Sequence, residues 1–471
     1  LFLNRWFYFA MNMNIPNFVE SSFFQPKQMK LLKLLFSLTV LALSYPMAKA
    51  DNDTIRLSRE DCIKIALQDN PTVKVADLEV KKFDYAKKEV IGSLFPSIDF
   101  SLSYQRSIEL QSMSMNMGGQ TNTIKMGTDN NWNTGFSASM PIINASLWKS
   151  INISDTQIVT ALEQARGSRI DLVNNINKAY YALLLAIDSR DVVKQNYDIA
   201  KMNAEIYQKQ FEQGTASEYD VLRSSVQVTN IEPELLQADI AIRQCQLQLK
   251  VLMGIDAAAN IWPTIHLENL QREMYGLPDG FNSDFSQNSS LRQLELNRKM
   301  MKQNVALQKL TWLPTLGVQF NINWNAMSNG NAFRNQTFNP YSNVALALNV
   351  PIFSGGRKLY AIRQAQVQMT ELDLQKENLT DALNMQVELA IDNINRQVRQ
   401  ISASEEGMKQ AAKAYQIMQK SFEIGAATYL NLRDSELANT SARLAYLQSI
   451  YNYLVSTSEL DALLGKDTPA K

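Results

Sequence analysis

Residues 211–214 read Phe-Glu-Gln-Gly and residues 422–425 read Phe-Glu-Ile-Gly, so one short pattern returns 211 positions later in a chain of 471 residues. Three further pairs of segments return in the same order at nearly the same distance. They are 252–254 with 463–465, 140–142 with 350–352, and 95–96 with 313–314. A repeat of this length is typical of a duplicated architecture. We therefore expect a first repeat at residues 51–254 and a second repeat at residues 286–465.

A short apolar segment near the start of the chain is typical of a secretory signal peptide. Lys30 and Lys33 precede an apolar run at residues 34–43, and an Ala-Lys-Ala cleavage pattern ends at Ala50. Such a run is too short to cross a membrane as a helix. We expect residues 29–50 to be a signal peptide that follows an N-terminal extension. A retained anchor helix is the alternative.

The charge balance excludes a nucleic-acid-binding function. The chain has 46 basic and 46 acidic residues, and residues 1–50 hold five of the basic and one of the acidic residues. The rest of the chain then carries a net charge of about −4, without the basic field that nucleic acid requires. No later segment has 18 consecutive apolar residues, so we expect no transmembrane helix.

Four segments alternate apolar and polar residues with the period of a β-strand, at about 97–106, 132–141, 315–325 and 342–352. A half-buried soluble sheet and a membrane β-barrel both give this pattern. The barrel is favoured because the polar positions are nearly all uncharged, and because aromatic residues and prolines lie near the strand ends. The aromatic residues are Tyr104, Trp132, Trp312, Trp324 and Tyr341, and the prolines are Pro96, Pro141, Pro314 and Pro351.

A long helical hairpin follows each pair of strands, at about 145–254 and 355–464. Both segments place apolar residues at steps of three and four, which is the pattern of a coiled-coil seam. A helix of some 65 residues is roughly 100 Å long. Gly214 breaks the first hairpin between its two helices, and Pro233 is expected to kink or interrupt the returning helix.

The remaining segments connect or follow the repeats. Residues 255–285 form a linker that contains the chain's single histidine, His266, and residues 466–471 form a C-terminal tail. Cys62 and Cys245 could form one disulfide. We prefer Cys245 as a small core residue, because it lies on the helical seam.

Four strands are too few to close a barrel, and an open sheet edge is not tolerated in lipid. The chain must therefore oligomerise if it spans a membrane, and cyclic symmetry would close the ring. Both ends of each strand pair return to the same side, so all long helices project there. The expected architecture is a polar-lined barrel that continues into a helical tube, which describes a conduit.

The chain resembles the TolC-type outer membrane efflux proteins, also called outer membrane factors, over residues 57–465. The most specific segments are 95–96, 211–215, 313–314, 350–357 and 422–426. The resemblance implies a mixed α+β membrane protein, a homotrimer whose four strands per chain form a twelve-stranded outer-membrane barrel above a periplasmic α-barrel. It also implies a periplasmic adaptor and an inner membrane pump, usually proton-driven, in a Gram-negative envelope.

The resemblance also implies roles for the turns of the two helical hairpins. Gly214, Thr215, Gly425 and Ala426 match family positions that contact the adaptor, although a plain helix-capping role is the simpler alternative. Candidates for a charged periplasmic aperture are Asp220, Arg433 and Asp434. The sequence departs from the family pattern here, because the basic residue and the tyrosine of the best-known relative are replaced, and solvated helix charge is the alternative.

Little in the sequence supports catalysis or a cofactor. Met113, Met115 and Met117 are weak candidates for a soft-metal site, since thioethers suit Cu(I), and ordinary loop composition is the simpler explanation. We expect a passive exit duct that is not an enzyme and has no cofactor. A soluble secreted coiled-coil binding protein and an envelope hydrolase are the alternatives. The sequence does not identify the transported substrate, because a passive duct has no catalytic residues from which its substrate could be inferred.

Overall fold

The computed structural model describes residues 55–117, 120–273, 284–334 and 336–466. The predicted signal peptide and residues 467–471 of the predicted tail lie outside these residues. The described residues belong to one compact unit.

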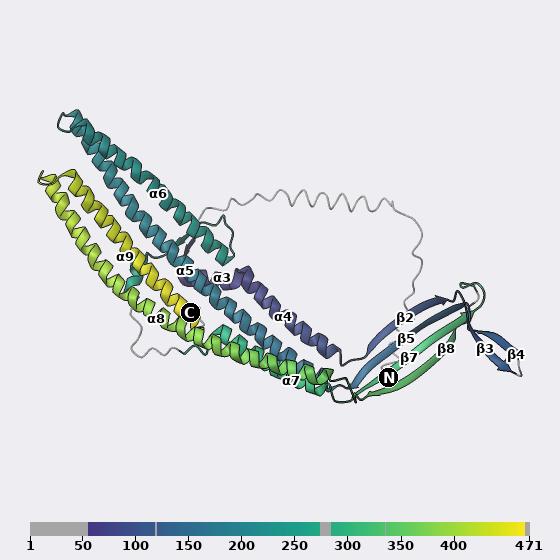
Figure 1. Cartoon of the computed structure of the whole chain (residues 1–471). Coiled ribbons are helices and arrows are strands. Elements are labelled where there is room, and N and C mark those ends of the chain that lie inside the picture. The colour runs from purple at the N-terminus through teal and green to yellow at the C-terminus, as the bar shows by residue number, and fades with distance from the viewer. Residues whose placement is uncertain (1–54, 118–119, 274–283, 335, 467–471) are drawn as a thin grey trace, which may run out of the picture. The chain divides into compact units, whose positions relative to one another are not determined.

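A four-stranded antiparallel sheet forms from strands of both repeats (Figure 1). Its order is β2 (Ser97–Arg106), β5 (Asn130–Ile143), β7 (Thr315–Ser328) and β8 (Asn339–Asn349). The two repeats meet where β5 pairs with β7. This sheet, together with two long helical hairpins, confirms the predicted fold class.

The strand register places all helix connections at one end of the sheet. Ser97 at the start of β2 lies opposite Ser139 near the end of β5, and Thr315 lies opposite Asn349 at the end of β8. Antiparallel pairing within each repeat therefore returns the chain to the end of the sheet from which it came. The opposite end carries the connecting loops.

Two of the predicted strand details were wrong. The last strand ends at Asn349 rather than 352, so Pro351 lies beyond it. Pro141 lies inside β5, at an irregularity where the register shifts between Pro141 and Ile143. A proline cannot donate to the ladder, and a bulge is one of the positions in a strand that accepts it.

The segment between the first two predicted strands, residues 108–130, contains a separate hairpin. Its strands are β3 (Gln111–Met117) and β4 (Gln120–Met126), which pair only with each other among the described strands. Strand β3 alternates polar residues with methionine, and β4 contains the β-branched Thr121, Thr123 and Ile124, which favour a strand.

Long helices follow the strands of each repeat (Figure 1). In the first repeat α4 (Pro71–Gly92) precedes β2, and α5 (Ala145–Glu212) pairs with α6 (Glu218–Met253). In the second repeat α7 (Ser289–Leu310) precedes β7, and α8 (Arg357–Glu423) pairs with α9 (Tyr429–Leu463).

The predicted interruption at Pro233 does not occur, because α6 continues through this residue. Pro233 is exposed. Water can therefore solvate the carbonyl that loses its partner, which lowers the cost of keeping the proline in the helix.

The hydrophobic core lies around the middle of α5. Tyr180, Leu183 and Leu184 of α5 are buried with Leu249 of α6 and Ile450 of α9. The N-terminal α3 (Arg59–Asp69) also packs on α5. This helix therefore forms the axis on which the other elements assemble.

The inter-repeat linker is partly structured. Its strand β6 (Ile261–Pro263) pairs in parallel with β1 (Ile55–Leu57), and the 3₁₀-helix η1 (Leu267–Glu273) follows it. Leu267 is fully buried in the core. Contacts with α5 and α9 hold η1 against the helices.

Both cysteines are free, so the disulfide left open by the sequence does not form. Cys62 is fully buried, and burial raises the pKa of its thiol to about 12. Cys245 is half-buried and packs against the core, as expected for a small residue on the seam. None of the described helices combines the length and apolar character needed to span a bilayer.

Candidate functional site

The two hairpin turns have the same backbone geometry. Gly214 and Gly425 have left-handed φ angles of +76° and +73°. The Thr215 N–H donates to Gln210 O at 2.8 Å, and the Ala426 N–H donates to Ser421 O at 2.7 Å. This is the bonding of a helix that ends in a left-handed glycine. The backbone alone therefore explains both glycines, and open space surrounds each of them.

The turns expose apolar side chains beside these glycines. Ile424 is 81% exposed, and Tyr219, Leu222 and Leu430 are also largely exposed. Exposed apolar groups mark a protein–protein contact site where they form a contiguous patch. Both turns therefore combine a fixed backbone with an accessible apolar surface.

Asp220 has a structural partner in its own turn. Its carboxylate accepts from the Ser217 hydroxyl at 2.6 Å and from the Ser217 N–H at 3.2 Å, and Ser217 caps α6 in return. This reciprocal capping box stabilises the start of α6. At the second turn Thr428 caps α9 by accepting from the Asn431 N–H, so an amide stands where the first turn has a carboxylate.

Arg433 also turns to a partner in its own helix. It donates to Glu436 Oε2 at 3.3 Å, and Glu436 is only 4% exposed. Burial raises the pKa of Glu436, although Arg433 opposes this shift. Asp434 is exposed. Within the described part of the chain no ion pair joins Asp220, Arg433 and Asp434 to one another, so the structure does not bring the three aperture candidates together.

An aromatic cluster joins the two hairpins near their turns, and the sequence did not predict it. The tip cluster comprises Tyr207 of α5, Arg223 of α6, Phe422 of α8 and Tyr429 of α9. The Tyr429 ring lies 5.4 Å from the Tyr207 ring, edge to face, and 6.3 Å from the Phe422 ring. The Arg223 guanidinium lies 5.3 Å from the centre of the Tyr429 ring.

The four residues of the tip cluster are half-buried, and burial raises the pKa of Tyr207 to about 12. Aromatic pairs and a cation over an aromatic ring each contribute on the order of 1 kcal/mol. Tyr429 contacts all three other elements and is therefore the central residue. Its position four residues after Gly425 was the only signal in the sequence that could have indicated it.

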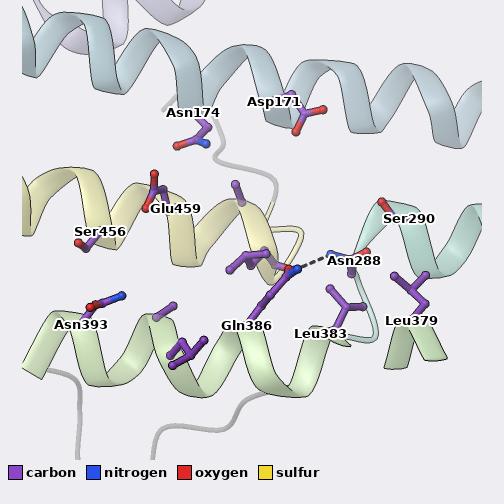
Figure 2. Close-up of a pocket in the computed structure, with 14 residues that line it drawn as sticks. Asp171, Asn174, Asn288, Ser290, Leu379, Leu383, Gln386, Asn393, Ser456 and Glu459 are labelled. Atoms are coloured by element: carbon purple, nitrogen blue, oxygen red, sulfur yellow. Dashed lines mark hydrogen bonds between the residues drawn. The ribbon is translucent and has the colours of Figure 1, made fainter. Parts of the chain in front are cut away.

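A cavity of about 620 Å³ lies between α5, α8, α9 and the start of α7 (Figure 2). Asp171 and Asn174 of α5 line one wall, and Glu459 of α9 lines another. The Asn288 side chain donates to Leu463 O at 2.8 Å at one end of the cavity. Burial raises the pKa of Asp171. The α8 side of the cavity is mixed, since the apolar Leu379 and Leu383 lie beside the polar Gln386 and Asn393.

The methionine candidates lie on the β3–β4 hairpin. Met113 is exposed, and the register places it opposite Ile124. The structure does not describe the side chains of Met115 and Met117, so the proposed soft-metal site stays a prediction.

Known proteins resemble this chain both in sequence and in structure. TolC of Vibrio cholerae is 20% identical over 333 residues, which are 70% of this chain and 76% of that protein. The alkaline protease secretion protein AprF of Pseudomonas aeruginosa is 22% identical over 415 residues, which are 87% of this chain and 84% of AprF. The CmeC outer membrane channel of Campylobacter jejuni has the same fold, with a TM-score of 0.70 at 17% identity over 86% of this chain and 85% of CmeC.

The duplicated sheet and helical hairpins thus define the class of outer membrane channel proteins. The sequence model described as outer membrane efflux protein matches residues 62–255 and 284–466. The chain belongs to this outer membrane efflux protein family, which confirms the predicted resemblance. Its location is the outer membrane, with a large periplasmic portion, and its function is that of an outer membrane channel in efflux or secretion.

Proposed function

We propose that three copies of this chain form the passive exit duct of a tripartite efflux or secretion machine. The observation that carries this proposal is the open sheet. Strands β2 and β8 lie at its two edges, and every residue of both strands is exposed in the single chain. Lipid does not tolerate unpaired edges, so β8 of one copy would pair with β2 of the next. Three copies supply twelve strands, which are enough to close a barrel.

The helices continue this barrel into the periplasm. All four connections leave the sheet at the same end, and α5 and α8 contain 68 and 67 residues. Helices of this length are about 100 Å long. Three copies would therefore build a tube long enough to reach far into the periplasm, where an adaptor would connect it to an inner membrane pump. A proton-driven pump would supply the energy, and a passive duct needs no chemistry of its own.

The two hairpin turns are the proposed adaptor-docking surface. Gly214, Thr215, Gly425 and Ala426 are exposed, and a side chain added at either glycine would meet no neighbour within the chain. The fixed backbone and accessible apolar groups of the turns suit contact with the tip of a partner hairpin. The helix-capping geometry is compatible with this role, because it presents the same turn in the same conformation in every copy.

The tip cluster is the proposed closure of the periplasmic aperture. Asp220 already caps α6 and Arg433 already pairs with Glu436, so each would have to leave a partner to form a charged lock. Tyr429, in contrast, already bridges the two hairpins. Of the three charged candidates, the exposed Asp434 is the one free to contact a neighbouring copy in the described structure.

Membrane association and conduction together test the exit-duct proposal. We expect the protein to resist carbonate washing of envelopes, to be extracted by detergent as a trimer, and to form conducting pores in planar bilayers. Light scattering measures the mass and bilayer recording measures the pores. Release by carbonate as a monomer would instead favour a soluble secreted coiled-coil binding protein.

A further inference from the structure

The inter-repeat linker places the chain's single histidine beside two carboxylates of α5. His266 immediately precedes η1, and Asp188 and Asp191 lie near the middle of α5. Their spacing of three residues puts both carboxylates on one face of the helix. The nitrogen of His266 and one oxygen of each aspartate lie within 4.8 Å of one another.

The environment of Asp188 shows that this group is built rather than accidental. The Asp188 side chain is 10% exposed, and its Oδ2 accepts from the Leu267 N–H at 2.8 Å. Its Oδ1 lies 2.6 Å from His266 Nδ1. The linker backbone thus holds one carboxylate oxygen and leaves the other facing the imidazole.

We propose that His266, Asp188 and Asp191 bind a divalent transition-metal ion of the Zn²⁺ class. Imidazole and carboxylate are ligands that such ions accept, and three protein ligands leave room for water in the remaining position. The bound ion would fasten the linker between the repeats to α5. This site is independent of transport through the duct.

Small movements of exposed side chains would form the coordination geometry. Ligand atoms about 2.0–2.1 Å from a tetrahedral Zn²⁺ lie roughly 3.3 Å from each other, so the His266 ring must move away from Asp188 by somewhat less than 1 Å. His266 is 61% exposed and Asp191 is 51% exposed, so both can adjust. The more buried Asp188 would stay in place, since Leu267 holds it.

Arg190 is the charged neighbour that competes for Asp191. It lies 3.4 Å from Asp191 but only 2.9 Å from Asp239 of α6. Arg190 can therefore keep its shorter contact with Asp239 while Asp191 turns to the metal. The ion would gain a carboxylate without leaving the arginine unpaired.

Calorimetric titration of the detergent-solubilised, chelator-treated full chain with Zn²⁺ tests the proposal. A pH of 8 is suitable because Asp188 raises the pKa of His266, and the metal needs the neutral ring. We expect one site per chain. Asp191→Asn and His266→Gln should each weaken binding at least tenfold, and Zn²⁺ should raise the Tm of the wild type but not of these variants.

The Asp191→Asn variant decides the question, since Asp191 takes no part in the His266–Asp188 hydrogen bond and its side chain is exposed. The matched control is Asp198→Asn, an exposed aspartate of α5 that pairs with Lys194 and should leave Zn²⁺ binding unchanged. Absence of saturable binding would overturn the proposal. Wild-type affinity in Asp191→Asn would also overturn it, because the ion would then bind elsewhere.

Discussion

At the scale of single residues, Glu436 is a carboxylate held where water cannot reach it. Among the described residues its ion-pair partner is the half-buried Arg433 of the same helix, which does not offset the loss of hydration. Burial therefore raises the pKa of Glu436 above its value in the unfolded chain. The folded chain binds more protons than the unfolded chain between these two pKa values, so stability falls as the pH rises through that window.

Glu436→Gln should remove this dependence, because the amide mimics the protonated acid. We expect its Tm to exceed that of the wild type at pH 7.5, and the difference to shrink as the pH is lowered toward the unfolded pKa of glutamate. Thermal unfolding followed by circular dichroism measures the Tm of the variant and of the wild type at each pH. Asp434→Asn is the matched control, since it removes the same charge at an exposed neighbouring site. If the Tm difference between Glu436→Gln and the wild type were the same at pH 7.5 and at the lower pH, the prediction would be contradicted.

Two substitutions of Gly425 distinguish the effect of backbone strain from the effect of blocked adaptor docking. Its φ of +73° disfavours any side chain, so Gly425→Ala should cost about 1 kcal/mol of stability. Gly425→Trp adds bulk into space that is open within the chain, so trimers should still form while export falls sharply. Export by cells and trimer content of their envelopes are the measurements. If Gly425→Ala reduced export as much as Gly425→Trp, strain rather than blocked docking would be the cause.

At the scale of elements, Tyr429 is the contact through which the two helical hairpins meet near their turns. Tyr429→Ala removes its ring from Tyr207 and Phe422 and removes the ring beneath Arg223, so the hairpins should separate more easily. We expect a several-fold higher conductance or open probability in planar bilayers.

Tyr219→Ala is the control for this experiment. It removes an aromatic ring from the other turn, but Tyr219 is exposed and makes no ring contact with the residues that the structure describes. Its conductance should equal that of the wild type. A Tyr429→Ala pore with wild-type conductance would show that the tip cluster does not limit the aperture.

The elements differ in how well the sequence predicts them. Strand β2 was predicted with its observed bounds, because its apolar residues alternate with polar residues over its whole length. The hairpin β3–β4 was missed because its segment is rich in Gly, Asn, Ser and Met, a composition typical of a loop, although its residues do alternate. The tip cluster and the His266 group were also missed, because their members lie far apart in the sequence and only tertiary packing brings them together.

The local environment of two residues adds what the sequence pattern did not show. Asp220 is an aperture candidate by the family resemblance, and its position three residues after Ser217 also fits a capping box. Pro233 was expected to kink or interrupt its helix because it lacks an N–H, and its exposure allows the helix to continue.

At the scale of the whole molecule, the sheet has one face for lipid and one for the lumen. Val344 lies in the middle of β8, pairs with Phe320 of β7 and is exposed in the single chain. Its neighbour Ala345 points to the opposite face, because successive residues of a strand alternate. In the closed trimer the apolar face of Val344 would contact lipid, and the face of Ala345 would contact water.

These two adjacent positions therefore distinguish a membrane barrel from a half-buried sheet. Val344→Arg should destabilise the inserted trimer by about 2–4 kcal/mol, because it places a charge in the apolar layer. Ala345→Arg should leave insertion near the wild-type level, since its charge would be hydrated in the lumen. Trimer abundance in purified outer membranes and the urea midpoint of the folded protein measure the difference. If both variants inserted equally well, neither face would contact lipid and the proposed closure of the sheet in the membrane would be wrong.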